Sequence, residues 1–113
     1  PRQLLGQPAS RGVVSGKAYV IKKHNDLAGL KSGDILVCDA IDPNMTFAIP
    51  LAAGIVERRG GMLIHGAIIA REYGLPCVTG IHDACNKIKN GDTVCVDGFL
   101  GIVTIQKRSK NES

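Results

Sequence analysis

Short apolar runs alternate with polar, glycine-rich segments along this chain, and their lengths predict a mixed α/β domain. The unbroken apolar run at residues 35–38 (ILVC) is typical of a strand buried on both faces. The alternating run at residues 92–97 (DTVCVD) is typical of a strand with one buried face. The strands predicted from such runs lie at residues 12–22, 35–38, 54–57, 76–79, 92–97 and 100–105.

Helix signals lie between these strands. An aspartate–proline pair at residues 42–43 predicts the start of a helix over residues 44–53, bent or ended near Pro50, since Asp favours the N-cap and Pro the first turn. A glycine and a proline just beyond Tyr73 predict the end of a helix that begins at His65. A third, short helix is expected over residues 83–89.

The order of these elements predicts the fold class. The middle of the chain runs strand, helix, strand, helix, strand, which favours a parallel sheet with crossover helices. The first and last strands are expected to form an antiparallel flank. We therefore expect an extended lead-in or linker at residues 1–11, one α/β domain at residues 12–106 and a polar tail at residues 107–113.

Composition narrows the class of partner. The 113 residues carry 14 Lys and Arg against 10 Asp and Glu, a net charge of +4, and 44% of them are apolar, which suits one soluble globular domain. Three of the basic residues sit in the tail and only four aromatic residues are present, so nucleic-acid binding is not expected. No apolar run is long enough to span a membrane and no secretory signal is visible. Because the first residue is Pro1, we expect the chain to be a piece of a longer protein.

The four cysteines suggest a reducing compartment. None belongs to a CxxC pair, and three lie in apolar stretches where a free thiol acts as a small hydrophobe. Reduced thiols predict a cytoplasmic protein. A zinc-stabilised binding domain is the weaker alternative, because its ligands would have looser spacing than structural zinc sites use. Those ligands would be Cys77, His82, Cys85 and Cys95.

The segment most suggestive of chemistry is residues 60–66 (GGMLIHG), where paired glycines follow a buried strand and a histidine opens a helix. Glycines let a backbone approach a ligand closely. The amides and the positive dipole end of a helix N-terminus suit a phosphate. A neutral imidazole at that point is a suitable nucleophile towards phosphorus. Local spacing alone favours the alternative interpretation, a histidine that only satisfies a backbone group.

A longer stretch favours the first interpretation. Residues 60–80 (GGMLIHGAIIAREYGLPCVTG) resemble the phosphohistidine signature of the phosphoenolpyruvate-utilising enzymes. That family includes phosphoenolpyruvate synthase, pyruvate phosphate dikinase, enzyme I of the sugar phosphotransferase system and rifampin phosphotransferase. The likeness covers about residues 33–105 and, more loosely, the lead-in. The resemblance implies a swivelling β/β/α domain with a parallel central sheet and an antiparallel β flank.

The resemblance also implies roles for individual residues. His65 matches the histidine that is transiently phosphorylated. The residues that match the family's pattern around the phosphate, or adjoin the histidine, are Gly60, Gly61, Gly66, Arg71 and Thr46. No metal site is expected in this domain, and no cofactor. The partners implied are an ATP-grasp domain, which would bind ATP and magnesium, and a domain with a second substrate site. The isolated domain is not expected to turn over.

The chain departs from the family at two positions. The family usually has Ser, Thr or Cys just before the histidine, and often Thr one place earlier, where this chain has Ile64 and Leu63. A hydroxyl that would bond the imidazole or phosphate is therefore missing, at a cost of about 1–3 kcal/mol. This departure supports an alternative function, a non-catalytic swivelling or docking module.

Overall fold

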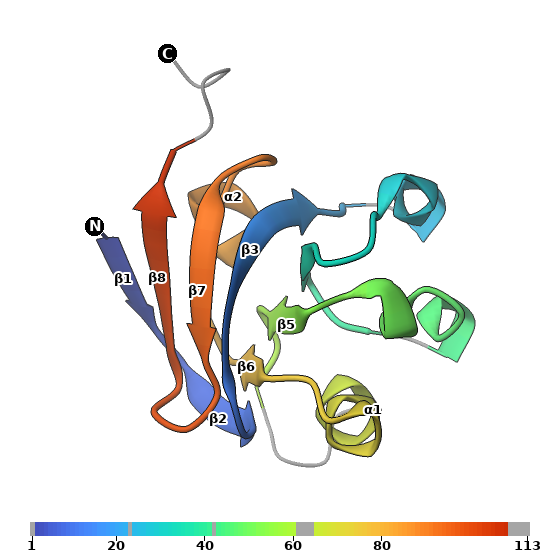
Figure 1. Cartoon of the computed structure of the whole chain (residues 1–113), viewed down its shortest axis with the longest axis horizontal. Helices are drawn as coiled ribbons and strands as arrows, with labels where there is room; N and C mark the ends of the chain where they lie inside the picture. The colour runs from blue at the N-terminus through green and yellow to red at the C-terminus, as the bar shows by residue number, and fades with distance from the viewer. Residues whose placement is uncertain (1, 23, 42, 61–64, 109–113) are drawn as a thin grey trace.

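The computed structural model describes residues 2–22, 24–41, 43–60 and 65–108 of the chain (Figure 1). The strands are β1 (Arg2–Leu5), β2 (Gln7–Ser10), β3 (Val13–Val20), β4 (Ile35–Cys38), β5 (Gly54–Glu57), β6 (Cys77–Thr79), β7 (Thr93–Asp97) and β8 (Ile102–Lys107). The helices are α1 (His65–Tyr73), α2 (Ala84–Lys87) and the 3-10 turns η1 (His24–Gly29), η2 (Pro43–Met45) and η3 (Ile49–Leu51).

The described strands join in one sheet, in the order β1-β8-β7-β3-β4-β5-β6-β2. Strands β3 to β6 run parallel to one another, with Leu36 of β4 opposite Ile55 of β5. Strands β1, β8, β7 and β3 pair antiparallel, and β2 closes the far edge antiparallel to β6. The predicted parallel centre with an antiparallel flank is confirmed.

Three layers follow from the burial of both faces of the parallel strands. All four residues of β4 and all four of β5 are buried. Leu36 and Cys38 pack in a core shared with α1 and the 3-10 turns, whereas Ile35 and Val37 pack in a second core with β7 and β8. Figure 1 shows the antiparallel strands on one side of the parallel ones and α1 on the other. This is the expected β/β/α arrangement.

Residues 1–11, predicted as a linker, contribute two strands instead. Strand β1 pairs with β8 and β2 pairs with β6. The side chains of Leu4 and Ala9 are buried in the two cores. Their partners lie about 100 and 70 residues further along the chain, so local sequence patterning carries no sign of the pairing.

The helix predicted over residues 44–53 is also wrong. Two 3-10 turns, η2 and η3, take its place. Pro50 lies in η3, where it cannot donate the amide hydrogen bond that a continuous helix would need. The turns still bury Met45 and Ile49 against the helical face of the sheet.

Helix α1 begins and ends where the sequence predicts. The amide of Leu75 bonds the carbonyl of Ala70 at 2.9 Å beyond its last residue. Gly74 takes a φ of +68°, the left-handed conformation that glycine adopts without strain. Ala67 and Ala70 are fully buried, and their small side chains let the helix lie close to the sheet.

The start of the predicted tail is held to the domain. Lys107 ends β8, and Arg108 Nη1 bonds the buried carboxylate of Asp92 at 2.8 Å and the carbonyl of Lys87 at 3.0 Å. The turn between β7 and β8 is held by Asp97, as expected of a turn aspartate. Its Oδ1 accepts hydrogen bonds from the amides of Phe99 and Leu100.

Candidate phosphohistidine site

The carboxyl ends of the parallel strands form the edge of the sheet where α1 begins. Strand β5 ends at Glu57, and the chain returns into α1 at His65. A Cβ on Gly66, the second residue of α1, would overlap Glu57 Oε1 and lie 3.0 Å from Ile41 Cγ1. The first turn of the helix therefore rests directly on the ends of β4 and β5. Its amides have no partner within the helix, and its dipole is positive at this end.

The predicted nucleophile lies at this point of the backbone. His65 is the first residue of α1, as its sequence context predicts. Gly60 follows β5 and is exposed, while Gly66 is buried. Gly61 lies outside the described residues, together with the two positions, Leu63 and Ile64, at which the chain departs from the family.

Thr46 lies in the segment that connects β4 to β5. It connects η2 to η3, is partly buried, and its carbonyl accepts a hydrogen bond from the Ile49 amide at 3.3 Å. Its neighbour Met45 lines a cleft at this edge. A contact between the Thr46 hydroxyl and a phosphate stays a prediction.

Arg71 occupies the last turn of α1. A rise of 1.5 Å per residue places its backbone about 9 Å along the helix axis from that of His65. Its Nε donates to the carbonyl of Ala9 in β2 at 2.8 Å. It also lines a hollow of about 440 Å³ beside the turn at Gly98 and Phe99. Its predicted role at the phosphate is not tested by these contacts and stays a prediction.

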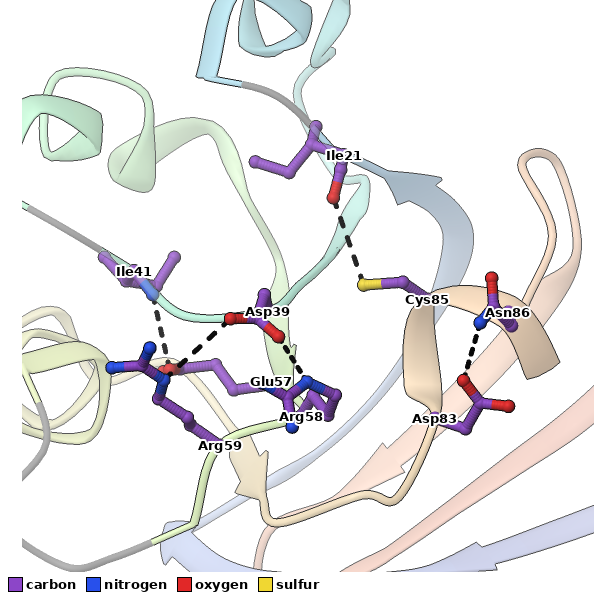
Figure 2. Close-up of polar contacts among 9 residues, drawn as sticks. All are labelled: Ile21, Asp39, Ile41, Glu57, Arg58, Arg59, Asp83, Cys85 and Asn86. Atoms are coloured by element: carbon purple, nitrogen blue, oxygen red, sulfur yellow. Dashed lines mark hydrogen bonds and ion pairs between the residues drawn. The ribbon is translucent and has the colours of Figure 1, made fainter.

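A cleft of about 740 Å³ opens at the carboxyl ends of β3, β4 and β5, beside the start of α1. Ligands in open α/β sheets bind at this edge. Figure 2 shows polar contacts among some of its lining residues, together with Glu57. The cleft is lined by Ile21, Lys22, Cys38, Asp39, Ala40, Ile41, Met45, Arg58, Arg59, Asp83, Cys85 and Asn86.

Two consecutive arginines set the charge of this cleft. Arg58 donates from Nε to Asp39 Oδ1, and Arg59 Nε lies 3.9 Å from Asp39 Oδ2, so one carboxylate sits between two guanidinium groups (Figure 2). The hydrogen bond from Arg58 lowers the pKa of Asp39 and raises that of Arg58. Both arginines remain about half exposed or more. With Lys22, the cleft holds three cations against the carboxylates of Asp39 and Asp83, so its rim carries a small net positive charge.

Glu57 is a buried carboxyl at the base of this edge. Its side chain has no exposure to solvent. Oε2 accepts one hydrogen bond, from the Ile41 amide at 3.3 Å, and Oε1 has no hydrogen-bond partner among the residues described. Burial raises the pKa of Glu57 to about 7, against the lowering effect of the Ile41 amide. A group titrating near neutral pH thus lies under the start of α1.

Residues 30–101 match the family described as the mobile domain of PEP-utilising enzymes. The chain belongs to this family. Rifampicin phosphotransferase of Bacillus subtilis is 44% identical to the mobile domain over 102 residues, which are 90% of this chain and 12% of that protein. Phosphoenolpyruvate synthase of Pyrococcus furiosus is 43% identical over 100 residues, 88% of this chain and 12% of the enzyme. The mobile domain therefore spans about an eighth of the length of these relatives.

Solved structures agree with this assignment. The solution structure of an enzyme I protein, nEIt, has a TM-score of 0.62 and 30% identity, and the match covers 71% of the mobile domain and 33% of that chain. Aconitase X of Thermococcus kodakaraensis has a TM-score of 0.74 at 20% identity, over 95% of the mobile domain and all of that chain. The second likeness shows the fold alone.

The zinc alternative has no support in the mobile domain as described. Among the described residues, no three His, Cys, Asp or Glu side chains lie close enough together to hold a metal ion. The four cysteines are free. Cys77 packs in the core beneath α1, whereas Cys85 lines the cleft, with Sγ 3.9 Å from the Ile21 carbonyl.

Sequence reasoning missed three members of this edge. Arg58 and Arg59 form a pair of cations directly after a buried strand, which was a usable signal. Glu57 stands at the end of an otherwise apolar strand, and its full burial is visible only in the structure.

Of the helices in the described ranges, none is long and apolar enough to cross a membrane.

Proposed function

We propose that this mobile domain carries a phosphoryl group on His65 between two sites of a larger phosphotransferase. The observation that carries the proposal is the position of His65 as the first residue of α1, at the carboxyl edge of the parallel strands and beside a cleft with a cationic rim. Its membership of the family supports the same role.

The chemistry requires a neutral imidazole at the start of α1. A ring nitrogen attacks the phosphorus of the donor in line, the donor's P–O bond breaks, and its electron pair leaves with the oxygen. The new N–P bond places a dianion beside the helix terminus, which stabilises it through amides and dipole. The acceptor then attacks phosphorus, and the electron pair of the N–P bond returns to the imidazole. Such a relay predicts ping-pong kinetics in the full enzyme.

The donor is proposed to be a nucleotide, ATP, or phosphoenolpyruvate. ATP and magnesium would bind an ATP-grasp domain elsewhere in the parent protein, and the acceptor would bind a further domain. Magnesium does not fit the acidic residues of this cleft, because Arg58 engages Asp39 and Asn86 Nδ2 engages Asp83 at 2.6 Å. We place the domain in the cytoplasm, where four free thiols remain reduced.

The test is labelling of the full enzyme with its radioactive donor. The wild type is expected to retain an acid-labile, alkali-stable phosphate, and His65→Ala to retain none with an unchanged far-UV circular dichroism spectrum. His82→Ala removes an exposed histidine at the same edge and is the matched control, expected to label normally. Labelling of His65→Ala would refute the assignment. A wild type that never labels would favour the non-catalytic docking module.

A further inference from the structure

A buried carboxyl with one unused oxygen lies directly under the first turn of α1. Glu57 Oε1 occupies the space that a side chain at residue 66 would need, so only glycine fits there. Glu57 is fully buried, and Oε1 has no hydrogen-bond partner among the described residues. A buried polar atom without a partner costs about 1–3 kcal/mol, so its presence here calls for a physical reason.

The groups that face Glu57 come from each element around it. Asp39, after β4, raises its pKa by repulsion, and Arg59, after β5, lowers it. The thiols of Cys38 and Cys77, on β4 and β6, have pKa values raised by burial and so stay neutral. On α1, the residues packed into this core beyond Gly66 are apolar alanines and an isoleucine, so within the described side chains the helix brings no further charge to Glu57.

We propose that Glu57 is a proton-linked positioning residue, ionised when the start of α1 is empty and protonated when a phosphoryl group occupies it. This inference rests on the proposed function of His65. It adds the uptake and release of one proton by Glu57 to each cycle of phosphorylation and transfer. Glu57 Oε1 lies against Gly66, the residue that follows His65 in the chain. The carboxyl group is shielded from water there, so charges interact with it strongly.

The sign of the coupling follows from charge. A phosphoryl dianion at the start of α1 repels a second anion at Glu57 and so raises the proton affinity of its carboxylate. Burial brings the pKa of Glu57 in the unphosphorylated domain to about 7, so the proton is available at neutral pH. Between that pH and the higher pKa of the phosphorylated form, each phosphorylation takes up one proton from solvent. Through Glu57 alone, the apparent equilibrium constant for phosphorylation then falls up to tenfold per pH unit, and below pH 7 this contribution of Glu57 disappears.

The direct test measures the protonation of Glu57 in both states of the 113-residue chain. Phosphoramidate modifies the imidazole without any partner domain: the ring nitrogen attacks phosphorus, the P–N bond of the reagent breaks and ammonia leaves. Carbon-13 NMR of the glutamate carboxyls, assigned with Glu57→Gln, then follows the titration. We expect a midpoint near pH 7 in the unmodified chain. After modification we expect a midpoint at least about one pH unit higher, a tenfold change in proton affinity.

The controls separate this inference from the proposed function. In His65→Ala treated in the same way, modification at the other histidines should leave the Glu57 midpoint unchanged. Equal midpoints in the modified and unmodified wild-type chain would overturn the proposal. If the midpoint shifts as expected but the full enzyme does not label His65 from its own donor, the proposed function fails while the coupling stands. A merely structural role for Glu57 would leave the midpoint insensitive to phosphorylation.

Discussion

Replacing Glu57 by glutamine is expected to change how the stability of the domain depends on pH. Glutamine has nearly the shape of glutamic acid and no charge to lose. Burial holds the pKa of Glu57 at about 7 in the folded chain, against 4.5 for an ordinary glutamate. Since a tenfold change in proton affinity is worth about 1.4 kcal/mol, ionising Glu57 destabilises the fold by about 3 kcal/mol.

The pH window follows from these two values. Below pH 4.5 the carboxyl is protonated in both the folded and the unfolded chain, and the wild type keeps its full stability. From pH 4.5 to 7 only the unfolded chain ionises, so the free energy of unfolding falls as the pH rises. Above pH 7 both states are ionised and this contribution is constant. The free energy of unfolding of Glu57→Gln should not decline in this way between pH 4.5 and 7.

Urea denaturation followed by far-UV circular dichroism between pH 4 and 8 measures the effect. The stability of Glu57→Gln relative to wild type should rise by about 3 kcal/mol across the window. Glu72→Gln, which changes an exposed glutamate of α1, is the matched control and should follow the wild type. A difference between Glu57→Gln and wild type that stays flat, or that falls with pH, would show that Glu57 is not a desolvated carboxyl.

Two substitutions and one deletion test the packing further. Gly66→Ala should destabilise the domain by about 1–3 kcal/mol although alanine favours a helix, because its Cβ overlaps Glu57, and the penalty should become smaller in a Glu57→Ala background, where only the tight contact with Ile41 remains; a stabilised single variant would contradict the contact. Asp92→Ala removes the hydrogen bonds that this buried carboxylate accepts from the Lys89 amide and Arg108, and should lower the free energy of unfolding by about 2 kcal/mol or more, measured by urea denaturation, against about 1 kcal/mol for the same change at an exposed turn aspartate. Deleting residues 1–11 removes two strands and should lower the urea midpoint sharply or abolish cooperative unfolding, whereas an unchanged midpoint would return them to the status of a linker.

The parts of the fold that depend on nearby residues could be predicted from the sequence. Strands β4 and β5 appear as short apolar runs, and α1 ends at a glycine with a positive φ. Those features predicted the layered α/β class. The 44–53 segment failed because its aspartate–proline start resembles that of a helix while Pro50 divides it into 3-10 turns.

The candidate site divides in a similar way. The paired glycines and His65 belong to one local motif, so the start of α1 could be placed from the sequence. The cleft could not, because its residues come from four separate segments that meet only when β3, β4 and β5 align.

By itself, the sequence determined which short segments form strands and helices and which histidine opens a helix, because these depend on propensities and on neighbours a few residues away. Only the tertiary structure decided that residues 2–10 complete the sheet, that Arg58 and Arg59 share Asp39, and that Glu57 is sealed beneath Gly66. Pairing, burial and proton affinity depend on which distant residues exclude water from a group, and that is settled by packing.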